Sequence, residues 1–220
     1  RIAPQAVSRS RVFFFSEFFG GSFMINQNNH FRIRYLTVTA ILSAFATVLM
    51  LLEFSVPFMP DFIKLDFSEI PLIAAFSMGP ISGVSVCLVK NLIHLPLSAT
   101  GGVGELSNFL LGVAFVLPAG IVYRFRHNRR AAFLSSLCGS LFMALLSLPL
   151  NYFVTYPIYA NFLPIDAIIG MYQAIFPSVN GLFWCLLVFN VPFTFLKGML
   201  DTLLTFLVYK RISPLIHGRS

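Results

Sequence analysis

The stretch 192–209 is apolar and long enough to cross a lipid bilayer, yet it carries two charged side chains, Lys197 and Asp201, in mid-span. A spanning helix needs about 20 residues, or slightly fewer at minimum. A charge at the centre of such a helix costs roughly 2.5–3.5 kcal/mol on insertion scales. A chain retains such residues where they face a partner, a cavity or a ligand. The surroundings of Lys197 therefore constrain both the fold and the function.

The composition is that of a membrane protein, with 57% hydrophobic residues and 10% charged residues. The lysines and arginines fall in short clusters at the ends of apolar runs, at 32–34, 124–130 and 210–211, as orientation signals do. This placement argues against nucleic acid as the reason for the net charge of +7. The three cysteines form no C-x-x-C, and no H-E-x-x-H occurs, so the sequence predicts neither a redox pair nor a metal site.

The apolar runs predict an all-α membrane protein with six transmembrane helices, at about 35–52, 68–78, 81–97, 105–123, 131–160 and 190–209. We expect Pro149 to kink the fifth helix, and Asn190 with Pro192 to start the sixth. All three basic clusters then lie on one side, so both termini are predicted to be cytoplasmic. Residues 1–31 are expected to be an N-terminal extension that is not native or is disordered. Residues 32–211 form the predicted membrane domain, and 212–220 a cytoplasmic tail.

Polar side chains are unevenly distributed along these predicted helices. At about 1.5 Å of rise per residue, those other than hydroxyls fall at the midplane or in the outer half. The inner half of the spans is nearly bare. This asymmetry predicts a pocket that opens outward and is closed below.

Two ion pairs are compatible with these depths. Lys90 and Asp201 come out at similar depth, and we expect them to form a structural pair that braces the third and sixth helices. Lys197 and Asp201 are also i,i+4 neighbours, and their pairing is the alternative in which Lys197 has a structural role. His94 is expected to be a packed, hydrogen-bonded histidine rather than a ligand.

Three segments resemble a known family. They are Lys64-Leu-Asp-Phe-Ser-Glu-Ile-Pro71, Gly104-Glu-Leu-Ser-Asn-Phe109 and Asn190-Val-Pro-Phe-Thr-Phe-Leu-Lys-Gly198. Together with six predicted spans, they resemble the substrate-binding S components of energy-coupling factor (ECF) vitamin transporters, most closely the riboflavin-specific, RibU-type branch. The resemblance covers about 32–211. The first and third segments are fairly specific for that branch, whereas the second is shared more widely.

The resemblance implies a high-affinity riboflavin-binding subunit, not an enzyme, with its pocket near the outer face. The residues that it assigns to substrate binding are Leu65, Asp66, Phe67, Glu105, Asn108, Asn151, Thr194 and Lys197. Threonine stands at 194 where the family pattern has asparagine, so a hydroxyl replaces an amide there. No cofactor is implied. An ammonium also binds phosphate, so FMN remains open as a ligand beside riboflavin.

The same resemblance implies partner chains in a bacterial cell membrane. Ala40 and Ala44 lie four residues apart in the cytoplasmic half of the first helix, a spacing that lets another helix approach closely. The resemblance assigns them to docking of the transmembrane coupling protein, and internal packing is the alternative. No Gly-x-x-x-x-Gly-Lys-Ser/Thr motif occurs, so ATP-driven transport would need two ATP-binding partner subunits.

Two other functions stay open at this point. One is an S component for another vitamin, of pyrimidine, thiazole or pterin type. The other is an intramembrane enzyme that uses Glu69, Glu105 or Asp201 as acid or base. Against the enzyme, these carboxylates are predicted at different depths.

Overall fold

The chain folds into an elongated helical bundle, seen in a computed structural model that describes residues 29–217 except 57, 58, 60–62, 67, 69, 99, 126 and 162. The side chains of 29–32, 34 and 209–217 are also outside the description. In chain order the elements are α2 (Asn29–Met50), β1 (Phe54–Ser55), β2 (Lys64–Leu65), α3 (Pro71–Met78), α4 (Pro80–His94), the 3-10 turn η1 (Leu95–Leu97), α5 (Val103–Phe125), α6 (Arg129–Leu150), the π-helical η2 (Asn151–Thr155), α7 (Tyr156–Tyr159), α8 (Ile165–Ile175), α9 (Leu182–Cys185), the π-helical η3 (Leu186–Asn190) and α10 (Val191–His217).

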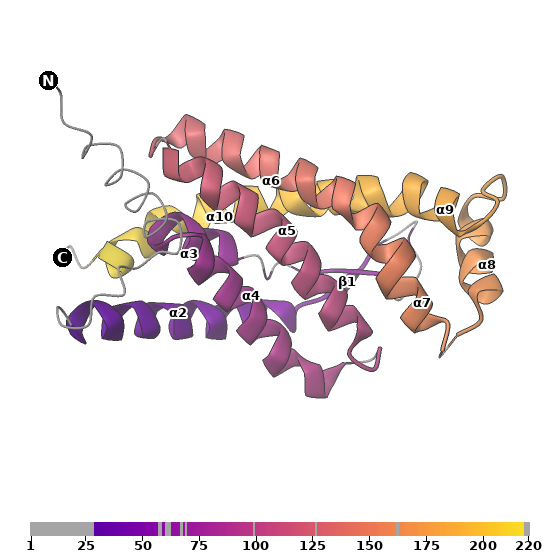
Figure 1. Cartoon of the computed structure of the whole chain (residues 1–220), viewed down its shortest axis with the longest axis horizontal. Helices are drawn as coiled ribbons and strands as arrows, with labels where there is room; N and C mark the ends of the chain where they lie inside the picture. Colours follow the sequence, from indigo (N-terminus) through magenta and orange to yellow (C-terminus); the bar gives the residue numbers. More distant parts are fainter. Residues whose placement is uncertain are drawn as a thin grey trace, which may run out of the picture.

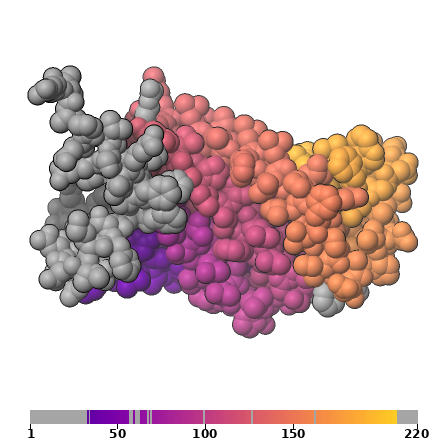
Figure 2. Space-filling model, in the orientation of Figure 1, coloured from indigo at the N-terminus to yellow at the C-terminus, as the bar shows by residue number. Residues whose placement is uncertain are grey.

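The two ends of the bundle differ in character. The start of α2, the turn between α5 and α6, and the end of α10 lie at one end, called here the basic end because it holds Arg124 and Arg129 (Figure 1). Helices α7, α8 and α9 form the opposite, distal end (Figure 1). The space-filling view shows this distal end as a continuous cap, coloured orange to yellow (Figure 2). At the basic end, the side chain of Asn128 caps α6 by accepting a hydrogen bond from the backbone N–H of Ala131.

Four continuous helices are long and apolar enough to cross a bilayer, among the residues that the structure describes. They are Pro80–Leu97, Val103–Phe125, Arg129–Tyr159 and Leu182–Val208. The apolar part of α2 is shorter, and α3 has eight residues, far fewer than the ~20 that a span needs. The chain is therefore an integral membrane protein by helix length and composition, and the six-span topology stays a prediction.

The last spanning helix begins earlier than the sequence predicts. It starts at Leu182 and continues through η3 into α10, so the prediction that Asn190 and Pro192 mark its start is wrong. Pro192 follows directly on the π turn of η3, where the helical hydrogen bonding is already irregular. In the fifth predicted helix the order is reversed, since Pro149 comes two residues before the π segment η2. Two π segments thus lie in the distal half of the bundle.

The loop after α2 contains a short hairpin that the sequence does not reveal. Strands β1 and β2 pair antiparallel, with Phe54 opposite Leu65 and Ser55 opposite Lys64. The Lys64 ammonium forms an ion pair with the Glu53 carboxylate at the base of this hairpin. The returning strand leads straight into Asp66, which is buried.

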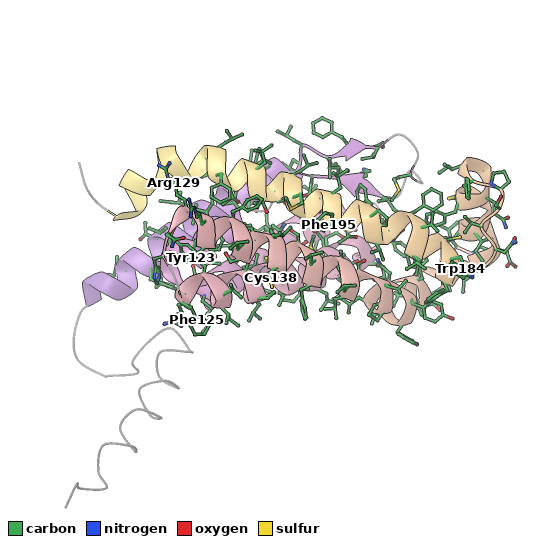
Figure 3. All side chains as sticks on the ribbon, turned by 90° about the horizontal axis from the view of Figure 1, so that it is seen from above. Tyr123, Phe125, Arg129, Cys138, Trp184 and Phe195 are labelled. Atoms are coloured by element: carbon green, nitrogen blue, oxygen red, sulfur yellow. The ribbon has the colours of Figure 1, made fainter. Side chains whose placement is uncertain are left out.

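Small side chains allow the long helices to pack closely. A Cβ atom on Gly139 of α6 would lie 2.5 Å from the backbone oxygen of Phe115 in α5. A Cβ on Gly198 of α10 would lie 2.7 Å from Oγ of Ser140. Such contacts are typical of helices that associate within membranes, where small residues let backbones approach. Large apolar side chains instead cover the outside of the bundle, as the stick view shows (Figure 3).

This packing predicts that Gly139→Ala destabilises the protein, by roughly 1–3 kcal/mol, because the added methyl group meets a backbone atom that cannot move aside. Gly170→Ala is the matched control, since a Cβ at Gly170 has nothing within 4 Å. We expect the control to be neutral or slightly stabilising, because alanine favours a helix over glycine by about 1 kcal/mol. Melting temperatures in detergent would measure both variants, and equal values would contradict the close approach.

Candidate functional site

Three of the predicted binding residues meet in one partly buried cluster. The Lys197 ammonium lies 3.1 Å from Oδ2 of Asp66 and 3.3 Å from Oδ1 of Asn108. The amide of Asn108 also donates to Oδ2 of Asp66, at 3.4 Å. Helix α10, helix α5 and the loop after α2 each contribute one of these side chains. The Lys197 charge in mid-helix is thus compensated by a carboxylate 131 residues away in the chain.

Asp66 is the centre of charge in this cluster. Its Oδ1 accepts hydrogen bonds from the backbone N–H of Ser68 at 3.0 Å and from the Ser68 hydroxyl at 2.5 Å. Lys90, which is fully buried, donates to the same Ser68 hydroxyl at 2.6 Å. Burial opposes ionisation of Asp66, but the charges of Lys197 and Lys90 and the Ser68 hydrogen bonds outweigh it, so the pKa of Asp66 lies well below its usual value. Asp66 is therefore a carboxylate at neutral pH.

The predicted ion pairs of Asp201 remain predictions. Asp201 is almost fully buried in α10, one turn beyond Lys197. Lys90, its expected partner, bonds to Ser68 as described above, while Lys197 reaches across to Asp66. The sequence places Lys90 near Asp201 by depth and Lys197 near Asp201 by i,i+4 spacing, but it does not identify Ser68 and Asp66 as acceptors. Those contacts depend on how the loop after α2 folds back, which neither depth nor spacing along a helix reveals.

Glu105 belongs to a separate group at the start of α5. Its Oε1 lies 2.9 Å from Nδ1 of His94, and its Oε2 accepts from the Ser98 hydroxyl at 2.5 Å. Ser98 also accepts hydrogen bonds from the backbone N–H groups of Thr100 and Gly102. This network ties the end of α4 to the start of α5, and it agrees with the expectation that His94 is packed and hydrogen-bonded.

The other predicted site residues are placed as follows. Asn151, buried in η2, accepts a hydrogen bond from the Ser107 hydroxyl at 3.4 Å, which brings it next to the Asn108 side of α5. Thr194 is buried one turn before Lys197, and Leu65 is half-buried in β2. Phe67 lies outside the described residues.

Helix α10 carries the cluster in the distal half of the bundle. Phe195, two residues before Lys197, lies between Cys138 in the middle of α6 and Trp184 at the distal end (Figure 3). Arg129 lies at the opposite end in the same view (Figure 3). The outward opening that the sequence predicts for this site stays a prediction.

A second hydrogen-bonded network, which sequence reasoning missed, holds the distal end together. The hydroxyls of Tyr156 and Tyr172 lie 2.6 Å apart, and Tyr172 donates to Oδ1 of Asn190 at 2.7 Å. All three side chains are buried. They come from α7, α8 and η3, so the network fixes α8 against both spanning helices that contain π segments. The sequence signal for this network is the presence of tyrosines in an otherwise apolar stretch.

We predict that Tyr172→Phe destabilises the protein by about 1–3 kcal/mol, because it leaves the Asn190 oxygen without its buried donor. Tyr152→Phe is the control, since Tyr152 is 38% exposed on the outside of η2. A surface change of this kind usually shifts stability by less than about 0.5 kcal/mol. Thermal unfolding in detergent distinguishes the two, and a Tyr172→Phe protein as stable as the control would contradict this role.

An open groove of about 460 Å³ lies elsewhere at the distal end, lined by Tyr152, Phe153, Pro157, Ile165 and Leu182. Its wall is mainly apolar. The Lys197 cluster is a better candidate for a ligand-binding site than this groove. A few converging polar groups among apolar helices can fix the orientation of a small ligand.

The cluster supplies groups for binding rather than for bond-breaking. It offers an ammonium, an amide that both donates and accepts, and an ionised carboxylate. Within the described part of the chain, no three His, Cys, Asp or Glu side chains lie close enough together to hold a metal ion. Fold and site together define a helical integral membrane protein with a buried polar site among its spans.

Comparison with known proteins gives the family. The family described as "ECF transporter, substrate-specific component" matches residues 34–209, and the chain belongs to it. A riboflavin transporter, RibU, from Staphylococcus aureus (strain TCH60) is 33% identical over 181 residues, covering 82% of this chain and 90% of that protein. A riboflavin transporter, FmnP, from Bacillus subtilis (strain 168) is 31% identical over 189 residues, covering 84% and 95%.

A solved structure of the S component of a bacterial ECF transporter has a similar fold. It superposes with a TM-score of 0.68 at 30% sequence identity and covers 84% of this chain and 98% of that one. The resemblance read from three sequence segments is thereby confirmed at the level of the family.

Proposed function

We propose that this chain is the riboflavin-binding S component of an ECF-type, ATP-driven vitamin importer in a bacterial plasma membrane. It would cross the membrane six times, with both termini in the cytoplasm and the site opening outward. The observation that carries the proposal is the convergence of Lys197, Asn108 and Asp66 in the distal half of the bundle. The printed names of the relatives, which are riboflavin transporters, support the choice of ligand.

The chemistry of the cluster suits a flavin. An isoalloxazine ring is apolar on its faces and carries carbonyls and an N–H along one edge. The Lys197 ammonium donates to such carbonyls or to ribityl hydroxyls, and the amides of Asn108 and Asn151 both donate and accept. The aliphatic and aromatic residues around these groups would cover the ring faces. Leu65, Phe67, Glu105 and Thr194 complete the proposed contact set.

We predict that Lys197→Ala weakens riboflavin binding by about 1–3 kcal/mol, roughly 5- to 150-fold, because a charged hydrogen-bond donor is lost. Lys64→Ala is the matched control, since it removes a lysine whose ion pair with Glu53 is about one third exposed. Quenching of flavin fluorescence on titration measures both affinities.

The wild-type titration tests the proposed function itself. Failure to bind riboflavin, combined with binding of a pyrimidine, thiazole or pterin vitamin, would move the protein to another S-component specificity. Unchanged riboflavin affinity in Lys197→Ala would give Lys197 a structural role only.

Ala40 and Ala44 are the proposed docking site for the transmembrane coupling protein. Both are exposed on α2, in agreement with an external contact rather than internal packing. They precede the outer hairpin by more than two turns, so docking and ligand binding would use different parts of the molecule. Two ATP-binding subunits would complete the transporter.

We predict that Ala40→Trp leaves riboflavin affinity within about two-fold of wild type but abolishes uptake in cells, because the indole blocks close helix approach. Leu145→Trp is the control, since it places the same indole on a different helix, α6, at a position that is 71% exposed. The control should retain uptake. A parallel loss of binding and uptake in Ala40→Trp would contradict the separation of the two surfaces.

An intramembrane enzyme is less well supported. Both oxygens of Glu105 are engaged by His94 and Ser98, and Glu69 lies outside the described residues. The relatives named above are transporters. An S component also needs no catalytic group, in keeping with the binding chemistry of the cluster.

A further inference from the structure

We propose that the Asp66 carboxylate makes the Lys197 site select an uncharged flavin over a phosphorylated one. This inference rests on the proposed function and deepens it, because it distinguishes riboflavin from FMN as the ligand. Asp66 then acts as a specificity-determining residue, in addition to any direct contact that it makes.

The first observation is that the charge of Lys197 is compensated before any ligand arrives. Its ammonium lies 3.1 Å from the Asp66 carboxylate, and the two side chains are only 13% and 10% exposed. Asn108 accepts a hydrogen bond from the Lys197 ammonium and donates one to the Asp66 carboxylate, so it helps to position both side chains. An anionic group that approached Lys197 would therefore enter a buried site directly beside a carboxylate.

The second observation concerns the other lysine of the cluster. Lys90 is fully buried and donates to the Ser68 hydroxyl at 2.6 Å, and that hydroxyl donates to Asp66 at 2.5 Å. The ammonium of Lys90 is therefore directed at the segment that carries Asp66. Within the described residues, Lys197 bonds to Asp66 and Lys90 bonds to Ser68, which itself bonds to Asp66.

The two candidate ligands differ in charge at one position. A phosphate monoester carries about −1.5 to −2 charges near pH 7, whereas the ribityl hydroxyl that it replaces is neutral. Like charges in a partly dehydrated site repel strongly, because the local dielectric is low. A hydroxyl or ring carbonyl accepts a hydrogen bond from Lys197 without this repulsion. With the ribityl end of the ligand at Lys197, the cluster therefore favours riboflavin.

The test is the ratio of the dissociation constants for FMN and riboflavin, measured by flavin fluorescence quenching on the full chain in detergent. We expect wild type to prefer riboflavin by at least about ten-fold, and Asp66→Asn to reduce this ratio by about ten-fold or more. Asparagine keeps the shape of aspartate and removes its charge. Glu53→Gln, which neutralises another acid of the same outer loop, should leave the ratio within about two-fold.

A neutral ester separates charge from size on the unmodified protein. Riboflavin 5′-acetate extends the same hydroxyl without charge, and we expect its affinity to lie closer to that of riboflavin than to that of FMN. This arm does not depend on whether Asp66→Asn folds. Asp66→Glu, which keeps the charge, should retain the preference for riboflavin.

Three outcomes would overturn the inference: wild type binding FMN as tightly as riboflavin, an unchanged ratio in Asp66→Asn, or the acetate binding as weakly as FMN. An unchanged ratio in which Asp66→Asn weakens both flavins equally would make Asp66 a structural residue. A wild-type protein that bound neither flavin would instead refute the proposed function.

Discussion

The ion pair between Lys197 and Asp66 is the interaction on which the rest of the structure depends. An ammonium in mid-span is costly unless an opposite charge reaches it, and a carboxylate in a loop between spans is free to stay in water. The loop instead folds back, through the hairpin of β1 and β2, and delivers Asp66 between α5 and α10. One electrostatic requirement thus fixes the path of the loop, the neighbours of α10 and the position of the polar site.

The remaining polar groups in the distal half follow the same logic. Glu105 is satisfied by His94 and Ser98, and Asn190 by Tyr172 and Tyr156. Each network joins elements that are far apart in the chain or separated by a turn. The Lys197 cluster differs from these two networks because it combines an ammonium, an amide and a carboxylate. Close packing at glycines such as Gly139 and Gly198 also holds the helices together.

The sequence predicted the class of fold because membrane spans have a strong signature in hydropathy and charge. The helices near 81–97, 105–123 and 131–160 correspond to those observed, to within a few residues at most ends. It also predicted three members of the cluster, Asp66, Asn108 and Lys197, through a family resemblance rather than through their contacts.

What the sequence could not supply were contacts that depend on the path of the chain in space. Asp66 and Lys197 are 131 residues apart, so no local pattern pairs them. The start of the last helix was misjudged because Asn190 and Pro192 look like a cap, whereas Asn190 bonds to Tyr172 within a continuous helix. The two π segments have no periodic signature distinct from that of an α-helix, and the hairpin strands are two residues each.

The most direct measurement is a structure of the full chain with riboflavin bound. The account predicts that a polar atom of the flavin lies within about 3.2 Å of the Lys197 ammonium, between α5, η2 and α10. The ring would then be enclosed by the helices in the distal half of the bundle. A flavin bound in the groove lined by Tyr152 and Phe153, with no flavin atom near Lys197, would contradict the account.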